Sequence, residues 1–472
     1  MAVLLGAPRT LGVSVPIGYD NTGDSHPGGH RGAGPALCHH WPMHRVVIVG
    51  GGFAGLSAAR ALAGTQVAVT IVDQRNFHTF QPLLYEVATA GLDTGDVAYP
   101  IRSIFGRSDN VTFRFATVAG VDWELGQVIL EATDPLPFDS LIVASGAQAK
   151  FFGIPGAAEF SFPLYTLTDA RRLRDHVLRR FEVADADRAS APESPLTFVV
   201  VGGGPTGVEV AGALAELLDV AVRHDGFRFP RAAARIVLVD GLDRLLTPFK
   251  SSAASYAADT LEGRGVELRL GRMVKAVTAT GVELDDGTRL PTQTVIWAGG
   301  VTVEGTVASR LGVSAGGNGR LLVDPDLSLR GRRDAYAIGD AAAVPWGPDE
   351  PERACPQLAQ VAIQSGAHAA RQVLNRAGGR PTTPFRYHDK GIMATIGRRA
   401  AITQFPGGAI IRGTLGWLAW LGLHIVYLIG FRNRIVVLVN WSWRYLSWGS
   451  GPRVIVGDKL EGADGGTSGR RS

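Results

Sequence analysis

Two glycine-rich segments of the chain have the spacing that holds phosphate groups. Each follows a run of β-branched residues and opens an Ala- and Leu-rich stretch. In such a turn the first glycine permits a tight bend, the second lets the backbone approach a pyrophosphate, and the third allows close helix–strand packing. The helix N-terminus then faces the phosphates with its positive dipole end. The glycines at these three positions are Gly50, Gly52 and Gly55 in the first segment and Gly202, Gly204 and Gly207 in the second. The pattern predicts two dinucleotide-binding sites.

An acidic residue ends the strand that we expect after each glycine segment. Asp73 closes the apolar run 67–73, and Asp240 closes the run 235–240. A carboxylate at this position accepts hydrogen bonds from a ribose hydroxyl. Asp240 favours NADH over NADPH because a carboxylate repels a 2′-phosphate, although Arg244 four residues later weakens that inference. Two dinucleotide sites in one chain indicate that electrons pass from one cofactor to another.

Two further predicted strands end in small residues. The segment 138–146 ends with Ala144 and Gly146, and the segment 294–300 has the same form and carries Gly299. Small residues at a strand end let the backbone come close to a ligand. We therefore expect both strand ends to lie at the dinucleotide sites.

A glycine and an acid follow a third short strand, in the segment 334–342. They are Gly339 and Asp340, and a helix is predicted to start directly after them. The Asp340 carboxylate can accept hydrogen bonds from a polyol, and the alternative is an ordinary helix N-cap. In the first interpretation the chain returns to its first dinucleotide domain after completing the second, so that the first domain is split and the second is inserted.

Composition excludes several other classes of protein. The 472 residues are enough for two or three domains with a large core. The net charge is only +4 and the basic residues are not clustered, so nucleic-acid binding is not expected. Cys38 and Cys355 are the two cysteines, which is too few for an iron–sulfur cluster held by four thiolates and gives no C-x-x-C dithiol. The histidines lack metal-ligand spacing, so no metal site is expected.

The C-terminal region is unusually apolar and rich in tryptophan. Residues 413–431 carry no formal charge over nineteen positions, between Arg412 and Arg432. A second apolar run, 435–439, leads into the Trp- and Tyr-rich stretch 441–448. This region fits a transmembrane span, a buried core or dimer helix, or a pair of interfacial segments on a bilayer. We favour the interfacial pair because many buried Trp side chains would need partners for their N–H groups.

Six motifs together resemble one enzyme family. They are 46–55, 80–85, 202–209, 338–341, 359–364 and 390–398. Through them the chain resembles the flavoprotein reductases with two dinucleotide folds. More narrowly, it is similar to the type II NADH:quinone oxidoreductases, the non-proton-pumping NADH dehydrogenases, of the actinobacterial kind. The stretches A-Q-x-A-x-Q at 359–364 and K-G-x-M-A-T-I-G-R at 390–398 are the most specific, and the resemblance covers about residues 44–450.

The resemblance implies a membrane-associated respiratory flavoenzyme that passes a hydride from NADH to FAD and two electrons on to a quinone. FAD would occupy the first glycine segment and NADH the second, and the quinone would be menaquinone or ubiquinone, with menaquinone favoured. A peripheral position on the cytoplasmic face of the cell membrane is implied, with contact to the lipid surface. A homodimer is one oligomeric state that the family allows.

Four residues would carry the quinone chemistry if the resemblance holds. Gln360 and Gln364 line the quinone site of the family, Glu209 couples charge or proton movement to quinone reduction, and Lys390 lies in the segment that closes the pocket. The residues alone leave simpler interpretations open. Acids are favoured in the first turn of a helix, as at Glu209; two glutamines four apart share one helix face; and Lys390 fits an ordinary surface cation.

The predicted fold is α/β, with two Rossmann-like domains of the glutathione-reductase kind and a C-terminal membrane-anchoring helical region. We expect a disordered or mis-annotated leader at 1–43, with Met43 as the natural start. The FAD domain would comprise 44–155 and 301–405, and the NADH domain 156–300. A membrane-anchoring region at 406–450 and a disordered tail at 451–472 would follow.

Three other functions compete with this one. A ferredoxin or rubredoxin reductase of the same fold would need neither the Trp-rich region nor the two glutamines. A sulfide:quinone oxidoreductase would need a cysteine pair at the flavin. A non-catalytic factor that binds flavin and NADH would use the same glycines.

Overall fold

The computed structural model describes residues 43–186, 196–447 and 453–456. The leader predicted for 1–43 lies outside this part of the chain except for Met43, and the tail predicted for 451–472 lies outside it except for 453–456.

A six-stranded sheet contains the first glycine segment at the end of its central strand. The strand order is β20-β21-β9-β1-β2-β5, and every neighbouring pair is parallel except β20–β21. Their bounds are β1 His44–Val49, β2 Val67–Asp73, β5 Val111–Phe115, β9 Ser140–Val143, β20 Ser328–Leu329 and β21 Arg332–Ala337. Strands β20 and β21 lie almost two hundred positions beyond β9 in the sequence. The part of the chain that follows the second glycine segment therefore completes this first sheet.

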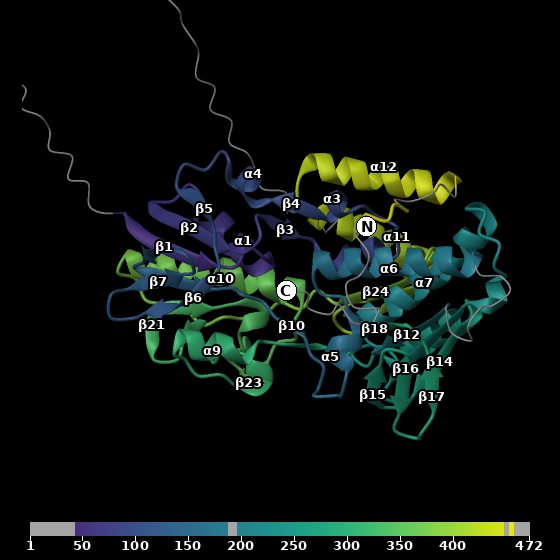
Figure 1. Cartoon of the computed structure of the whole chain (residues 1–472). Coiled ribbons are helices and arrows are strands. Elements are labelled where there is room, and N and C mark those ends of the chain that lie inside the picture. Colours follow the sequence, from purple (N-terminus) through teal and green to yellow (C-terminus); the bar gives the residue numbers. More distant parts are fainter. Residues whose placement is uncertain (1–42, 187–195, 448–452, 457–472) are drawn as a thin grey trace, which may run out of the picture. The chain divides into compact units, whose positions relative to one another are not determined.

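A second sheet of five parallel strands repeats this arrangement around the second glycine segment. Its order is β11-β18-β12-β13-β14. The bounds are β11 Ser161–Pro163, β12 Thr197–Val201, β13 Arg235–Asp240, β14 Val266–Leu270 and β18 Thr294–Trp297. The run Thr197–Val201 is buried at every position, as expected for a parallel strand covered on both faces. The predicted α/β fold with two Rossmann-like sheets is confirmed (Figure 1).

Two helices start at the glycine segments, and a third packs on the first of them. Helix α1 spans Phe53–Leu62, α7 spans Pro205–His224, and α10 spans Ala359–Ala377. A side chain at Gly366 of α10 would overlap the carbonyl oxygen of Ala54 in α1, so the glycine permits the two helices to approach closely. The Ser57 hydroxyl also donates to the carbonyl oxygen of Ile363 at 2.7 Å. The A-Q-x-A-x-Q helix is therefore held against the first dinucleotide site.

The remaining elements are further helices, 3₁₀ turns and the strands of small antiparallel sheets. The helices are α2 Leu84–Ala88, α3 Thr94–Val97, α4 Ile101–Phe105, α5 Ala157–Phe160, α6 Leu167–Ala186, α8 Ser251–Gly263 and α9 Gly305–Leu311, with 3₁₀ turns at Gln81–Leu83, Arg231–Ala233, Gly317–Gly319 and Gly339–Ala341. The strands are β3 Phe77–Thr79, β4 Ala98–Pro100, β6 Val118–Asp122, β7 Gln127–Leu130, β8 Thr133–Pro137, β10 Gln148–Ala149, β15 Val274–Thr278, β16 Gly281–Leu284, β17 Arg289–Pro291, β19 Val301–Thr302, β22 Pro345–Gly347 and β23 Glu350–Ala354.

The stretch after residue 390 forms a sheet that packs on α7. Strands β24 Ile392–Gly397, β25 Ala400–Gln404 and β26 Ile410–Arg412 form one antiparallel sheet. A side chain at Gly212 of α7 would overlap the carbonyl oxygen of Ile396, so α7 and β24 lie in backbone contact. This sheet crosses the predicted boundary at residue 405, because β26 lies beyond that boundary and pairs with β25.

The apolar C-terminal region forms two helices rather than one. Helix α11 spans Gly413–Tyr427 and α12 spans Phe431–Ser447, and Gly430 between them has a φ of +86° (Figure 1). The nineteen-residue uncharged run is thus interrupted before it ends. Among the described residues, no helix has both the length and the apolar character that a membrane crossing requires.

Three tryptophans of these helices, Trp417, Trp420 and Trp441, face the protein, in contrast to the headgroup position that the density of tryptophan suggested. Trp420 and Trp441 are 1% and 2% exposed, and Trp417 is also buried. Their ring planes pack together, with 5.7 Å between the centroids of Trp420 and Trp441. The surface of the two helices is instead aliphatic, and its most exposed members are Leu415, Leu418, Leu423, Val426, Ile435, Leu438 and Val439.

Candidate active site

The two glycine segments have matching hydrogen-bond geometry. The backbone N–H of Gly51 donates to the Asp73 carboxylate at 2.6 Å, and the N–H of Gly203 donates to Asp240 in the same way. The second oxygen of Asp240 accepts from the N–H of Leu242 at 2.6 Å. Each acid predicted from the sequence therefore lies directly beside its own glycine turn.

The first glycine of each segment is required by backbone conformation and by space. Gly50 and Gly202 have φ values of +107° and +114°, in the region that favours glycine. A side chain at Gly50 would overlap the carbonyl oxygen of Ala144, and one at Gly202 would meet the carbonyl group of Ala298. The small residues that end β9 and β18 thus lie against the glycine turns, and Gly299 directly follows Ala298.

The third glycines, Gly55 and Gly207, are equally constrained. A side chain at either would overlap the carbonyl oxygen of the first glycine of the same segment. The second glycines differ, because no atom lies within 4 Å of a side chain built at Gly52 or Gly204. Both residues are N-caps, and no side chain caps either helix start. Each helix start therefore has open space and uncapped N–H groups, which fits a bound pyrophosphate.

Asp340 and Gly339 lie beside the first site, in a 3₁₀ turn and not at the start of a long helix. The helix predicted directly after them is absent, since α10 begins only at Ala359 after the hairpin β22–β23. Gly339 has a φ of +62°, and a side chain there would come within 2.8 Å of the Ala54 side chain. The N-cap interpretation of Asp340 is therefore wrong.

Tyr165 connects Asp340 with the end of β9, and no local sequence pattern predicted it. Its hydroxyl donates to the Asp340 carboxylate at 3.3 Å and accepts from the N–H of Ala147 at 3.2 Å. The hydroxyl oxygen of Tyr165 is also the nearest atom, at 3.7 Å, to a side chain built at Gly146. Burial raises the pKa of Asp340, so its carboxylate gains from hydrogen-bond donors that a polyol supplies.

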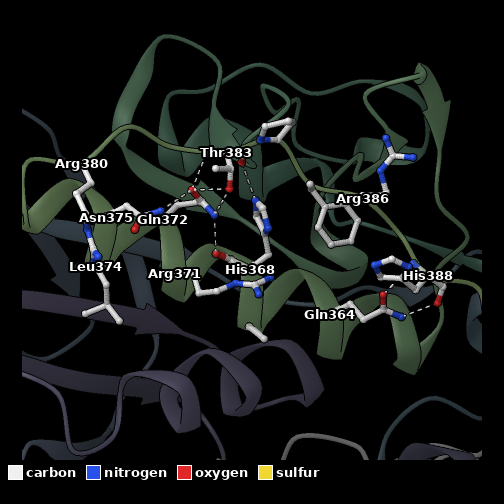
Figure 2. A pocket seen from close by; sticks show the side chains of 13 residues that line it. Gln364, His368, Arg371, Gln372, Leu374, Asn375, Arg380, Thr383, Arg386 and His388 are labelled. Atoms are coloured by element: carbon white, nitrogen blue, oxygen red, sulfur yellow. Dashed lines mark hydrogen bonds between the residues drawn. The ribbon is translucent and has the colours of Figure 1, made fainter.

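Both glutamines of α10 have partners, which are main-chain groups. The Gln364 amide pairs with both main-chain groups of His388 (Figure 2). It donates to the carbonyl oxygen at 2.9 Å and accepts from the N–H at 3.0 Å. The Gln360 amide donates to the carbonyl oxygen of Gly391 at 2.9 Å and accepts from the N–H of Lys390 at 3.1 Å. The sequence suggested a quinone carbonyl as one such partner. In the structure the two amides hold the segment 388–391 along the helix.

Lys390 is exposed and points to the C-terminal helices. Its ammonium group donates to the hydroxyl of Tyr427, the last residue of α11, at 3.2 Å. This contact joins the segment held by the glutamines to the aliphatic surface of α11. Tyr427 was not among the residues predicted for the site, because nothing in the local sequence shows which residue meets a lysine side chain.

Glu209 lies in α7, on the side that faces β24. It is the fifth residue of the helix and no acid lies in the first turn, so the dipole interpretation does not explain it. Its carboxylate accepts from the N–H of Thr395 at 3.4 Å. Desolvation, together with the nearby charge of Glu86 on α2, raises the pKa of Glu209 to about 8 although the side chain is partly exposed. Glu209 therefore holds a proton at neutral pH.

One segment, 388–395, thus connects the four residues that the resemblance assigned to the quinone. Gln364 holds it at His388, Gln360 holds it at Lys390 and Gly391, and Thr395 contacts Glu209. The sequence predicted these residues as separate motifs. The structure brings them together through the strand β24.

The histidines near the first site are neutral and structural. His78 and His424 are buried, and burial lowers the pKa of each to about 4. His78 Nδ1 lies 3.1 Å from the carbonyl oxygen of Gly51, and the His424 ring stacks on Trp420 with 4.1 Å between centroids. His388 is exposed. In the part of the chain that the structure describes, no group of three His, Cys, Asp or Glu side chains is arranged to hold a metal ion.

Comparisons with known proteins agree with this geometry. Residues 44–366 match the family model described as pyridine nucleotide-disulphide oxidoreductase. Two proteins of Mycobacterium tuberculosis are similar in sequence: the type II NADH:quinone oxidoreductase NdhA, 37% identical over 438 residues, and the type II NADH:quinone oxidoreductase Ndh, 38% identical over 434 residues. Each alignment covers 88% of this chain and 90% of the relative.

A solved structure shows the same fold. The structure of NDH2 from Plasmodium falciparum in complex with NADH superposes with a TM-score of 0.79 at 19% identity, over 87% of this chain and 99% of that one. The chain therefore belongs to the type II NADH:quinone oxidoreductase family, as its six motifs predicted.

Proposed function

We propose that this protein oxidises NADH and reduces a quinone, most readily menaquinone, with FAD as its bound cofactor and without pumping protons. The observation that carries the proposal is the segment 390–397. Gln360 of α10 holds the start of this segment and Glu209 of α7 contacts Thr395 within it, so residues that the resemblance assigns to the quinone meet along one segment. When bound, FAD supplies the chemistry that separates oxidation of the nucleotide from reduction of the quinone.

The two dinucleotides are assigned to the two glycine segments. We place FAD at Gly50–Gly55, with Asp73 at the ribose and Asp340 at a hydroxyl of the cofactor's polyol chain. NADH would lie at Gly202–Gly207 with Asp240 at its ribose. The open helix starts at Gly52 and Gly204 support both assignments.

Asp240 directs the site to NADH rather than NADPH. Arg244, the residue that could have neutralised a 2′-phosphate, is tied down elsewhere. Its guanidinium donates to the Ser251 hydroxyl at 3.1 Å and to the carbonyl oxygen of Thr247 at 2.9 Å. Equal kcat/KM values for NADH and NADPH would contradict this assignment.

Glu209 serves as a proton source beside the site. Reduction of a quinone to a quinol takes up two protons, and a carboxyl group that is protonated at neutral pH can supply one from its Oε atom. Gln360 and Gln364 act by position, since their amides fix the segment that carries Lys390. Lys390 places a positive charge at the end of that segment nearest α11.

The protein would associate peripherally with the cytoplasmic face of the cell membrane through α11 and α12. Leu415 is 70% exposed and Val426 is 62% exposed, although both belong to an apolar helix. Exposed aliphatic side chains of this density mark a contact with lipid or protein. Arg412, directly before α11, and Arg434, in the first turn of α12, are exposed and would meet anionic headgroups. The proposal also includes a homodimer and the six-part division of the chain predicted from the sequence, with the boundary at 405 moved beyond β26 because β26 pairs with β25.

The test is NADH oxidation by the FAD-loaded protein with menaquinone and ubiquinone analogues and with a soluble dye. Glu209→Gln should lower kcat with quinone and leave the dye rate close to wild type, because only quinone reduction needs the proton. Glu216→Gln, two turns along the same helix, is the matched control and should change neither the kcat with quinone nor the dye rate. A protein that reduces the dye but no quinone would be a reductase for another acceptor, and one that binds both cofactors without turnover would be a non-catalytic factor.

A further inference from the structure

A cationic pocket lies along α10 beyond the glutamines. It has a volume of about 540 Å³ and lies between the C-terminal half of the helix and the segment 380–388 (Figure 2). This volume falls in the range that small-molecule sites occupy. Gln364 and His388 close one end, and the pocket extends away from Gln360 toward Asn375 and Arg380.

Three arginines line the pocket, and none of its lining residues that the structure describes is acidic. Arg386 has an ion pair with Asp349 at 2.9 Å. The guanidinium groups of Arg371 and Arg380 make no hydrogen bond or ion pair with any residue in the described ranges. Two guanidinium groups without carboxylates around one concavity create a local positive potential that an anion relieves.

The shape of the pocket is fixed by hydrogen bonds across its inner wall. His368 Nε2 lies 3.0 Å from the carbonyl oxygen of Thr383, and the Gln372 amide accepts from the Thr383 N–H at 2.8 Å. Both α10 side chains are buried. The opposite wall, segment 380–388, is therefore held at a set distance from the helix before any ligand arrives.

We propose that this pocket binds a small soluble molecule that carries a phosphate or diphosphate group, with Arg371 and Arg380 as its anion ligands. Guanidinium groups suit phosphate because their N–H groups pair with two oxygens at once. The pocket lies outside the two glycine segments and the glutamine-held quinone segment. It is thus a third anion site in a protein whose proposed reaction needs two.

A ligand in this pocket would affect the position of the quinone segment through the pairing of Gln364 with His388. Gln364 lines the pocket and also pairs with both main-chain groups of His388, two residues before Lys390. A ligand held between α10 and segment 380–388 restrains the position of that pair, and therefore of Lys390. This second step rests on the proposed function, whereas the binding site itself does not.

Binding is tested by calorimetry on the FAD-loaded full chain at low salt, with saturating NAD⁺ to fill the second glycine segment and inorganic pyrophosphate as the probe. We expect saturable binding that Arg371→Gln and Arg380→Gln each weaken by about tenfold, the loss of one charge-assisted pair. Arg371→Lys should weaken it less, because it keeps the charge and loses the fork. Arg310→Gln, an exposed arginine of α9 away from the pocket, is the matched control and should bind as the wild type does.

Several results would overturn the proposal. One is no saturable binding to the wild type, and another is equal weakening in the Arg310→Gln control, which would show that pyrophosphate senses only net charge. Failure of pyrophosphate to bind, while phosphatidylglycerol vesicles bind and the two pocket variants weaken them, would assign the arginines to a lipid headgroup. Retention of FAD and an unchanged circular dichroism spectrum show that each variant is folded.

The coupling is tested by the KM for a quinone analogue. Saturating pyrophosphate should change this KM at least twofold in the wild type and leave it unchanged in Arg371→Gln, with the dye rate constant throughout. An unchanged KM in the wild type would overturn the coupling. A protein without quinone activity would overturn the proposed function, while the calorimetric result would still decide the binding site.

Discussion

Glu209 and Glu216 lie two turns apart on α7, and the structure predicts opposite effects when each is replaced by glutamine. Glu209 faces β24 and accepts one long hydrogen bond from Thr395, while desolvation raises its pKa to about 8. Glu216 is ion-paired with Arg264 at 2.6 Å and accepts from the N–H of Arg398. Charge at Glu209 therefore opposes folding, and charge at Glu216 favours it.

The sign for Glu209 follows from proton linkage. The folded state binds this proton more tightly than the unfolded state, so the contribution to stability is fully present below the unfolded pKa and is lost as pH rises toward 8. Between pH 5.5 and 8.5 the loss amounts to about 3 kcal/mol, at about 1.4 kcal/mol per pKa unit. A chain of this length unfolds with an entropy of roughly 1 kcal/mol per kelvin, so the loss corresponds to about 3 °C in Tm.

The assay is thermal unfolding of the FAD-loaded protein, followed by circular dichroism at both pH values. The Tm of Glu209→Gln minus that of the wild type should increase by about 3 °C from pH 5.5 to 8.5, because glutamine has no proton to lose. Glu216→Gln should lower Tm at both pH values, since it removes the ion pair with Arg264. A Glu209→Gln difference that stays constant or shrinks with pH would refute the reasoning, and so would matching behaviour of the two variants.

Three further outcomes follow from the same geometry. Gly202→Ala should raise the KM for NADH by more than tenfold, because a side chain there meets the carbonyl group of Ala298. Gly204→Ala should raise it less, because no atom lies close to a side chain built there. Fluorescence titration with NADH checks both variants, and equal losses of NADH binding would contradict the argument. Tyr427→Phe removes the hydrogen bond to Lys390 and keeps the ring, so the KM for quinone should rise about two- to fivefold with an unchanged dye rate, a net loss of one exposed hydrogen bond. Replacing Leu415 and Val426 by glutamate should move the protein from the membrane fraction to the supernatant with its dye activity intact; continued sedimentation with membranes would count against the role of α11.

The dinucleotide sites could be predicted almost fully from the sequence because their chemistry is local. A glycine turn, the strand before it and the acid at the end of the next strand lie within thirty or forty residues of one another, and the backbone geometry of Gly50 and Gly202 leaves no other residue type. Tyr165 could not be found in this way. It reaches Asp340 across the fold, and neither residue carries a local pattern that names the other.

The C-terminal helices show why composition alone does not orient a segment. Tryptophan suits both a lipid interface and a protein core, and only the partner surface decides between them. Here α11 packs on β25, and Trp417 and Trp420 belong to the same buried apolar cluster as residues 400–402 of that strand, which leaves the aliphatic residues outside. Deleting the region would therefore expose core surface, so point substitutions at Leu415 and Val426 separate membrane contact from folding more cleanly.

The glutamine pair shows how two side chains of a family motif are held by the main chain of another segment. Two amides on a mostly apolar helix need hydrogen-bond partners, and the sequence predicted this need but could not identify the partners. The structure fills it with the main chain of residues 388–391, in four hydrogen bonds between 2.9 and 3.1 Å. Loss of either amide would free the segment that carries Lys390 and continues into Thr395 beside Glu209. The effect of such a variant on quinone reduction therefore reports the position of the whole strand, and Gln364→Glu, which keeps the acceptor and loses the donor, separates that positional role from direct contact with the quinone.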